Sequence, residues 1–193
     1  VIFYGPPGTG KTTLAKVIAN TTSARFEQIN ATVAGKKDME EIVKTAKDAI
    51  GMYGQKTILF VDEIHRFNRA QQDAFLPFVE KGSIILIGAT TENPSFEVIT
   101  PLLSRCQVYV LKSLEKADLL ELLDRAINED AHIHSLNIEV KETESILRYS
   151  GGDARKLLNI IELVTNSGVK VIDNETVTKQ LQQNPVAYDK DGE

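Results

Sequence analysis

The sequence predicts a doubly wound α/β fold, a parallel sheet sandwiched by helices, followed by a small all-helical domain. Strand-like runs alternate with helical segments in the first part, and several runs are apolar throughout, as in strands buried on both faces. From about Ser113 the strand-like runs stop and helical stripes continue. We therefore expect an α/β core at 1–112, a helical domain at 113–183 and a linker at 184–193.

The strands of the core are expected to be short. They are predicted at Val1–Tyr4, Arg25–Asn30, Thr57–Val61, Ser83–Ala89 and Val108–Leu111. Between them, helices are predicted after the first strand and at 37–50 and 68–80, where apolar residues recur at helical spacing. Acidic residues open the 37–50 segment and Lys47 lies near its end, which suits the dipole of a helix.

The second domain is predicted from four helical stripes. These cover 116–128, 142–149, 154–166 and 174–183. Asp173 stands where the N-cap of the last helix should be.

Composition describes an ordinary globular chain. Of its 193 residues, 42% are hydrophobic and 25% charged, which argues against disorder. No apolar stretch is long enough to cross a bilayer, and no signal sequence opens the chain. The single cysteine, Cys106, excludes an internal disulfide and fits a reducing compartment, so we expect the cytoplasm and no membrane partner. The net charge of −5 argues against a uniformly basic nucleic-acid coat but leaves room for a local basic face.

A glycine-rich segment follows the first strand directly and leads into a helix. It reads Gly5, Pro6, Pro7, Gly8, Thr9, Gly10, Lys11, Thr12 and Thr13. Glycines let the backbone turn tightly and approach an anion, and successive N–H groups with the positive end of the helix hold phosphates. Lys11 is expected to reach the β- and γ-phosphates, and the Thr12 hydroxyl to ligand Mg²⁺. The segment predicts a nucleoside triphosphate site.

Two adjacent carboxylates end the apolar run 58–61. Ligands of such sheets bind beyond the carboxyl ends of the strands, so Asp62 and Glu63 should emerge beside the phosphate loop. Asp62 is expected to hold Mg²⁺, and Glu63 to orient and deprotonate an attacking water. The Asp-Glu pair and the lack of a guanine-reading Asn-Lys-x-Asp motif favour ATP hydrolysis.

Three further residues complete the predicted site. Thr91 follows Thr90 at the end of a strand and is placed to hold the water or sense the γ-phosphate; hydroxyls are also ordinary at strand ends. Arg105 precedes the last strand and is placed to enter a neighbouring subunit's site, or else to form a surface ion pair. Arg155, at the start of a helix, could fold onto the phosphates of its own subunit or remain in solvent.

These motifs together resemble an AAA+ ATPase of the clamp-loader clade. Gly5–Thr13 matches the Walker A motif of that family and Leu59–Glu63 its Walker B motif. Thr91 falls at the sensor 1 position, Ser104–Cys106 matches the arginine-finger motif, and Gly152–Arg155 matches sensor 2. The resemblance implies an AAA+ sheet with a helical lid, ATP and Mg²⁺ as ligands, Arg155 acting in cis and Arg105 acting in trans.

Longer stretches narrow the resemblance. Asp62–Asp73, Gly88–Glu97 and Tyr188–Gly192 are similar to the replication-associated recombination protein A (RarA, also MgsA) family, which is related to the Werner helicase-interacting protein. That family implies a DNA-stimulated ATPase at stalled forks and DNA ends, partnered by single-strand-binding protein. It also implies a homo-oligomer, commonly a tetramer, working in the cytoplasm at the nucleoid. Asn30, which ends the second strand, is a candidate for the polar switch that restrains Glu63.

The chain opens inside a strand, at Val1. We therefore expect a domain cut from a longer protein, without the preceding segment that helps to hold adenine in AAA+ proteins and without the C-terminal oligomerisation region. The function expected is a DNA-dependent ATPase of replication, recombination or repair. A clamp-loader subunit and a Holliday-junction branch-migration motor share the same chemistry, and a non-catalytic nucleotide-binding assembly module is a more distant alternative. His65 either couples DNA contact to Glu63 or caps the next helix.

Overall fold

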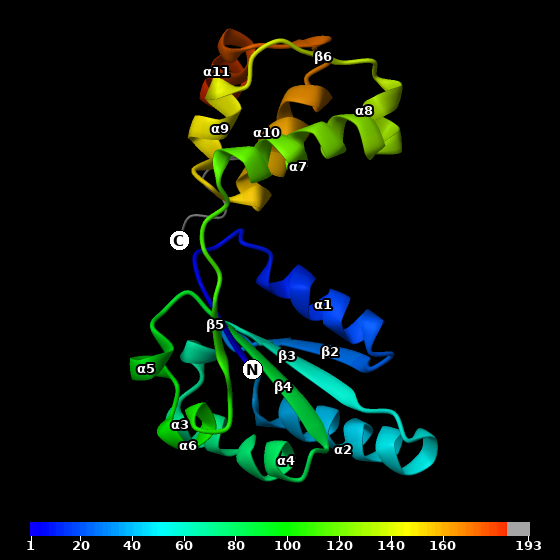
Figure 1. The fold of residues 1–193 in the computed structure, drawn as a ribbon, viewed down its shortest axis with the longest axis vertical. Helices are drawn as coiled ribbons and strands as arrows, with labels where there is room; N and C mark the ends of the chain where they lie inside the picture. The colour runs from blue at the N-terminus through cyan, green and yellow to red at the C-terminus, as the bar shows by residue number, and fades with distance from the viewer. Residues whose placement is uncertain (185–193) are drawn as a thin grey trace. The chain divides into compact units, whose positions relative to one another are not determined.

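The structure is a computed structural model that describes residues 1–184, apart from the side chain of Lys36. The chain divides into two compact units (Figure 1). The first comprises Val1–Pro6 and Gly10–Lys112, and the second comprises Pro7–Thr9 and the chain from Ser113 onward. The expected linker lies, except for Asn184, outside the described residues. No helix within 1–184 is long and apolar enough to span a membrane.

The first unit contains a five-stranded parallel sheet, as the sequence predicts. Its strands are β1 (Ile2–Tyr4), β2 (Arg25–Asn30), β3 (Thr57–Asp62), β4 (Ile84–Thr90) and β5 (Val108–Val110). Their order in the sheet is β2-β3-β4-β1-β5, and every pairing is parallel. β4 therefore lies between β1 and β3, which places the end of β4 between the segments that follow those two strands.

Helices cover both faces of this sheet (Figure 1). α1 (Lys11–Thr21) covers one face, and α2 (Lys36–Tyr53) and α4 (Leu76–Glu80) cover the other. The alternation of side chains along β3 separates the two cores: Ile58 and Phe60 pack in the cluster that includes Ala15 and Ala19 of α1, whereas Leu59 and Val61 pack in the cluster of α2 and α4. Short elements complete the unit: the 3₁₀ turn η1 (Ile64–Arg66), α3 (Arg69–Asp73), α5 (Pro94–Glu97) and α6 (Thr100–Leu103).

The expectation of one helix over 68–80 is wrong. The chain forms α3 and α4 there, with Ala74 and Phe75 between them. Pro77, in the first turn of α4, explains the break, because proline has no N–H to donate and its ring clashes with the carbonyl four residues earlier. Phe75 is buried and packs on Phe67 with ring centroids 5.8 Å apart, so the break also inserts an aromatic side chain into the core.

The second unit is helical, as predicted. Its helices are α7 (Lys116–Glu129), α8 (Ala131–Ser135), α9 (Glu144–Ser150), α10 (Ala154–Asn166) and α11 (Asn174–Gln183). Asp173 caps α11 as expected, because its side chain accepts the Thr176 N–H at 2.8 Å. The same bond holds the pKa of the Asp173 carboxyl below its usual value. A feature the sequence did not predict is a parallel pair of two-residue strands, β6 (Glu139–Val140) and β7 (Val171–Ile172).

The core of the second unit gives a stability prediction. Leu157 and Leu158 are neighbours on α10, but Leu157 is fully buried and Leu158 is 41% exposed. Leu157→Ala is expected to lower the free energy of unfolding by about 2–5 kcal/mol, because it leaves a cavity among packed helices. Leu158→Ala, the matched control, should change it by about 0.5 kcal/mol or less. Urea denaturation followed by circular dichroism measures both, and equal effects would contradict the packing described here.

Candidate nucleotide-binding site

The phosphate loop, the two carboxylates and Thr91 follow the carboxyl ends of neighbouring strands of the first unit. β1 runs in register with β4, pairing Tyr4 with Thr90, and β3 pairs with the other side of β4. The main chain after β1 is also bonded to β4, since the Gly5 N–H donates to the Thr90 carbonyl at 3.2 Å. The phosphate loop, the end of β4 and the carboxylates after β3 therefore follow three adjacent strands.

Glycine is required at several positions of the phosphate loop. A Cβ on Gly5 would lie 2.2 Å from the carbonyl oxygen of Leu111, closer than backbone atoms allow. Gly8 and Gly10 have φ angles of 69° and 83°, which favour glycine. Gly10 is the N-cap of α1 and offers no side-chain acceptor to the first N–H groups of that helix. The loop thus leads to a helix N-terminus suited to bind an anion.

Lys11, the first residue of α1, is held inside the loop. Its side chain is buried, and Nζ donates to the carbonyls of Gly5 at 2.8 Å and Pro6 at 2.7 Å. A buried ammonium needs such acceptors, and phosphate oxygens are stronger acceptors than carbonyls because they carry charge. The loop therefore fits a triphosphate, with the cation, the helix end and the tight turns that the sequence predicted.

The two carboxylates lie at the carboxyl end of β3. Asp62 ends the strand, and its Oδ1 accepts the N–H of Glu63 at 3.1 Å. Glu63 adopts a φ of 53°, a left-handed conformation that is costly for a residue with a side chain and is concentrated at functional sites. Both side chains are half-buried, as is Thr12 on α1. The hydroxyl and carboxylate oxygens of Thr12 and Asp62 are the ligand types that Mg²⁺ takes.

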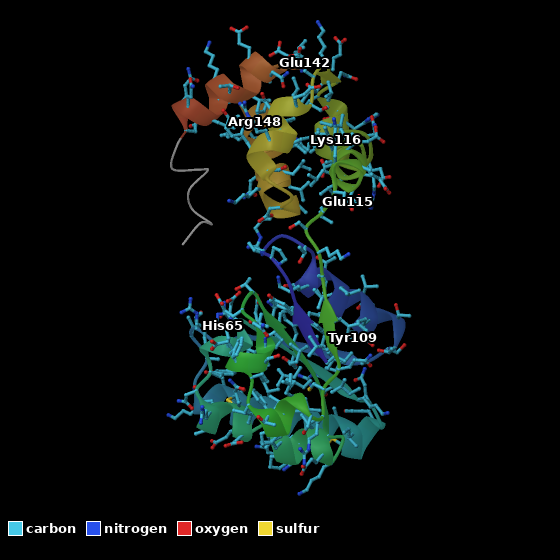
Figure 2. All side chains as sticks on the ribbon, turned by 60° about the vertical axis from the view of Figure 1, so that its left-hand side comes forward. His65, Tyr109, Glu115, Lys116, Glu142 and Arg148 are labelled. Carbon is cyan, nitrogen blue, oxygen red and sulfur yellow. The ribbon has the colours of Figure 1, made fainter. Side chains whose placement is uncertain are left out.

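Glu63 contacts a histidine that the motifs did not assign. Nε2 of His65 lies 3.2 Å from Oε2 of Glu63, and Nδ1 lies 2.9 Å from the Thr90 hydroxyl. Figure 2 labels His65 in the first unit.

Asn30, the candidate switch, does not bond Glu63 in this way; its side-chain oxygen accepts the N–H and hydroxyl of Thr32 at 2.9 and 2.7 Å. Thr91 follows β4 directly and is half-buried. Two features of the sequence could have pointed to the contacts of His65: its place two residues after Glu63, and the adjacent Thr90 and Thr91 at the end of a strand.

Arg105 lies on the surface of the first unit, after α6. Its Nη2 forms a 2.6 Å ion pair with Oε1 of Glu80, and its Nη1 donates to the Pro101 carbonyl at 2.8 Å. Both side chains of the ion pair are more than 40% exposed. Exposed pairs contribute about 0–1 kcal/mol, so the guanidinium can leave Glu80 at little cost.

Arg155 belongs to the second unit. It lies in the first turn of α10, where the Asp153 side chain accepts its N–H at 2.8 Å and that of Lys156 at 3.1 Å. Its side chain is exposed. Its place at a nucleotide stays a prediction from the motif.

Comparison with known proteins identifies the family. Residues 1–114 match the ATPase family associated with various cellular activities (AAA), and residues 132–193 match the AAA C-terminal domain. Replication-associated recombination protein A of Coxiella burnetii is 48% identical over 201 residues, covering 100% of this chain and 45% of that protein. ATPase WRNIP1 of Dictyostelium discoideum is 37% identical over 215 residues, covering 100% of this chain and 24% of that protein.

Solved structures agree. The Thermotoga maritima RuvB Holliday junction branch migration motor superposes with a TM-score of 0.71 at 26% identity, over 94% of this chain and 60% of that one. The chain spans less than half the length of the curated relatives named above. The predicted AAA+ fold and the resemblance to replication-associated recombination protein A are both confirmed. From the phosphate loop, the carboxylates that follow β3 and the family match over residues 1–114, we conclude that the chain belongs to the AAA family of ATPases, enzymes that hydrolyse ATP.

Proposed function

We propose that this chain is the motor part of a DNA-dependent ATPase, which hydrolyses ATP between subunits to remodel stalled replication forks or DNA ends. The similarity to replication-associated recombination protein A, which covers all of this chain and 45% of that protein, supports a role in replication and recombination. The observation that carries the chemistry is the strand order. Because β4 lies between β1 and β3, the phosphate loop and Glu63 follow the strands on either side of β4, and Thr91 follows β4 itself.

Each residue has a stated role in the proposed reaction. Lys11 and the loop N–H groups bind the phosphates, and Thr12 with Asp62 would hold Mg²⁺, which neutralises phosphate charge when bound. Glu63 orients a water molecule and accepts its proton, and Thr91 senses the terminal phosphate.

Two arginines complete the proposed site. Arg155 acts on the nucleotide of its own subunit, and Arg105 acts on that of a neighbour. The ion pair between Arg105 and Glu80 is exposed and costs little free energy to break. This supports the role of Arg105 in trans, because a residue that acts on a neighbouring subunit must be able to leave its own surface.

The proposed partners come from the same resemblance. We infer that the natural protein is a homo-oligomer, a tetramer, that binds forked or single-stranded DNA together with single-strand-binding protein. Its place of action is the cytoplasm, at the nucleoid.

Two alternatives make different predictions. The similarity to RuvB favours a Holliday-junction motor as the second candidate. A clamp-loader subunit, which shares the same chemistry, is the other alternative. A non-catalytic nucleotide-binding module is disfavoured because Glu63 is intact and in contact with His65.

The test is the ATPase rate of the whole natural protein carrying this sequence, measured without DNA and with a panel of DNA structures. Forks, gaps and free ends are expected to stimulate hydrolysis most. Greater stimulation by four-way junctions would favour the branch-migration motor, and stimulation only by a sliding clamp with primed DNA would favour the clamp loader. Nucleotide binding with no hydrolysis under any condition would support the non-catalytic assembly module.

A further inference from the structure

Glu63 and the phosphate loop are joined by a chain of hydrogen bonds that passes through two side chains. The Gly5 N–H donates to the Thr90 carbonyl at 3.2 Å. The Thr90 hydroxyl lies 2.9 Å from Nδ1 of His65, and Nε2 of His65 lies 3.2 Å from Oε2 of Glu63. The chain therefore runs from the loop that holds phosphate to the carboxylate that acts on water, across 58 residues of sequence.

Two side chains of this hydrogen-bond chain are buried. Thr90 is fully buried at the end of β4, and the His65 side chain is 8% exposed. The Thr90 oxygen also accepts the Glu92 N–H at 2.9 Å, which fixes the start of the loop that carries Thr91. Glu63, by contrast, is 30% exposed and holds a strained φ of 53°. The more exposed and strained member of the chain is thus held by its buried members.

The chemistry of the groups sets the direction of the bonds. An ionised carboxylate only accepts, so Nε2 of His65 must carry a hydrogen to bond Glu63. The Thr90 hydroxyl pairs with Nδ1 in either protonation form, because it can donate to a bare Nδ1 or accept from a protonated Nδ1 while donating to the Glu92 carbonyl at 3.2 Å. In both forms the hydroxyl holds the ring in the orientation that directs Nε2 toward Glu63, as an outer hydrogen bond does for other functional histidines.

We propose that His65 is a positioning residue of the ATPase site, which aims the Glu63 carboxylate and links it through Thr90 to the phosphate loop. The inference rests on the proposed role of Glu63 in hydrolysis. It gives a physical route by which movement of the phosphate loop or of the segment 90–93 changes the aim of Glu63. His65 binds neither phosphate nor metal in this proposal, so it affects the rate of hydrolysis and leaves the affinity for ATP unchanged.

The test separates these roles by comparing turnover with nucleotide affinity in the whole natural protein. His65→Leu removes both ring contacts and is expected to lower kcat about 10- to 100-fold, since small misplacements at a reacting centre cost that much, while the Kd for a fluorescent ATP analogue stays within about twofold. His65→Gln places an amide near Nε2 and should restore part of kcat. His134→Leu, at an exposed histidine on α8, is the control and should leave both unchanged.

A double-mutant cycle tests the link itself. Thr90→Val keeps the shape of the residue but removes the hydroxyl, so it should lower kcat in the same direction as His65→Leu. If Thr90 and His65 act in one chain of hydrogen bonds, kcat of the double variant should be little lower than kcat of His65→Leu alone. Thr57→Val is the matched control: Thr57 is a buried threonine on β3 whose hydroxyl has no hydrogen-bond partner within the part of the chain that the structure describes.

Three outcomes would overturn the inference: wild-type kcat in His65→Leu, additive losses in the cycle, or equal loss of kcat and ATP affinity. If Glu63→Gln is inactive and His65→Leu is active, the positioning role of His65 is contradicted and the hydrolytic role of Glu63 stands. An active Glu63→Gln would instead remove the hydrolytic role proposed for Glu63.

Discussion

Replacing Glu63 by glutamine is expected to lower ATP turnover by a factor on the order of 10²–10⁴, which is the contribution of a positioned general base. The carboxamide has the shape of the carboxylate, and its oxygen still accepts from Nε2 of His65, which lies 3.2 Å from Oε2 of Glu63. It does not accept a proton from water. ATP binding, which depends on Lys11 and the loop N–H groups, should persist.

Turnover is measured by phosphate release and binding by a fluorescent ATP analogue. Glu121→Gln, the same substitution at an exposed position of α7, controls for the change in charge and should behave as the unmodified protein. Turnover in Glu63→Gln equal to that of the unmodified protein would remove Glu63 as the base.

The second large effect is expected at Arg105. If its guanidinium neutralises charge on the nucleotide of a neighbouring subunit, Arg105→Ala should lower turnover by about 10³–10⁵ and leave the subunit's own ATP binding intact. Arg125→Ala is the matched control, because Arg125 is also exposed and paired with a glutamate, Glu129, at 3.4 Å. That control should retain full turnover.

Mixed oligomers decide whether Arg105 acts in trans. Arg105→Ala subunits keep Glu63, and Glu63→Gln subunits keep Arg105, so each variant alone has low turnover. When the two are mixed, some interfaces combine an intact Glu63 with an intact Arg105, and part of the turnover should return. No recovery on mixing, with subunit exchange verified, would contradict a role across the interface.

Periodic segments with clear ends were predictable from the sequence. β2 at Arg25–Asn30 and α10 at Ala154–Asn166 have the predicted bounds; for α10 the helical spacing begins directly after its N-cap residue, Asp153. The helices α5 and α6, with four residues each, and the strands β6 and β7, with two each, are too short to display a period. The break between α3 and α4 had a visible cause in Pro77, but helical spacing continued through it.

The candidate site also has a part that the sequence predicts and a part that required the structure. Lys11, Asp62 and Glu63 were predictable because each stands in a short motif whose chemistry is local. The contact between His65 and Thr90 joins residues 25 positions apart and depends on the order of strands in the sheet. A single sequence predicts that strands exist but not which of them are neighbours, so this contact required the structure.

The position of β4 has a consequence for the dimensions of the site. Neighbouring strands lie about 4.8 Å apart, so the strand before the phosphate loop and the strand before Glu63 are separated by about 10 Å. β4 therefore acts as a spacer between the phosphate loop and the carboxylates that follow β3. In the proposed reaction, a nucleotide bound by the phosphate loop must extend to Glu63 before water can attack its terminal phosphate. Under the proposed roles, this spacing favours a triphosphate over the diphosphate that hydrolysis leaves, because the diphosphate is one phosphate shorter.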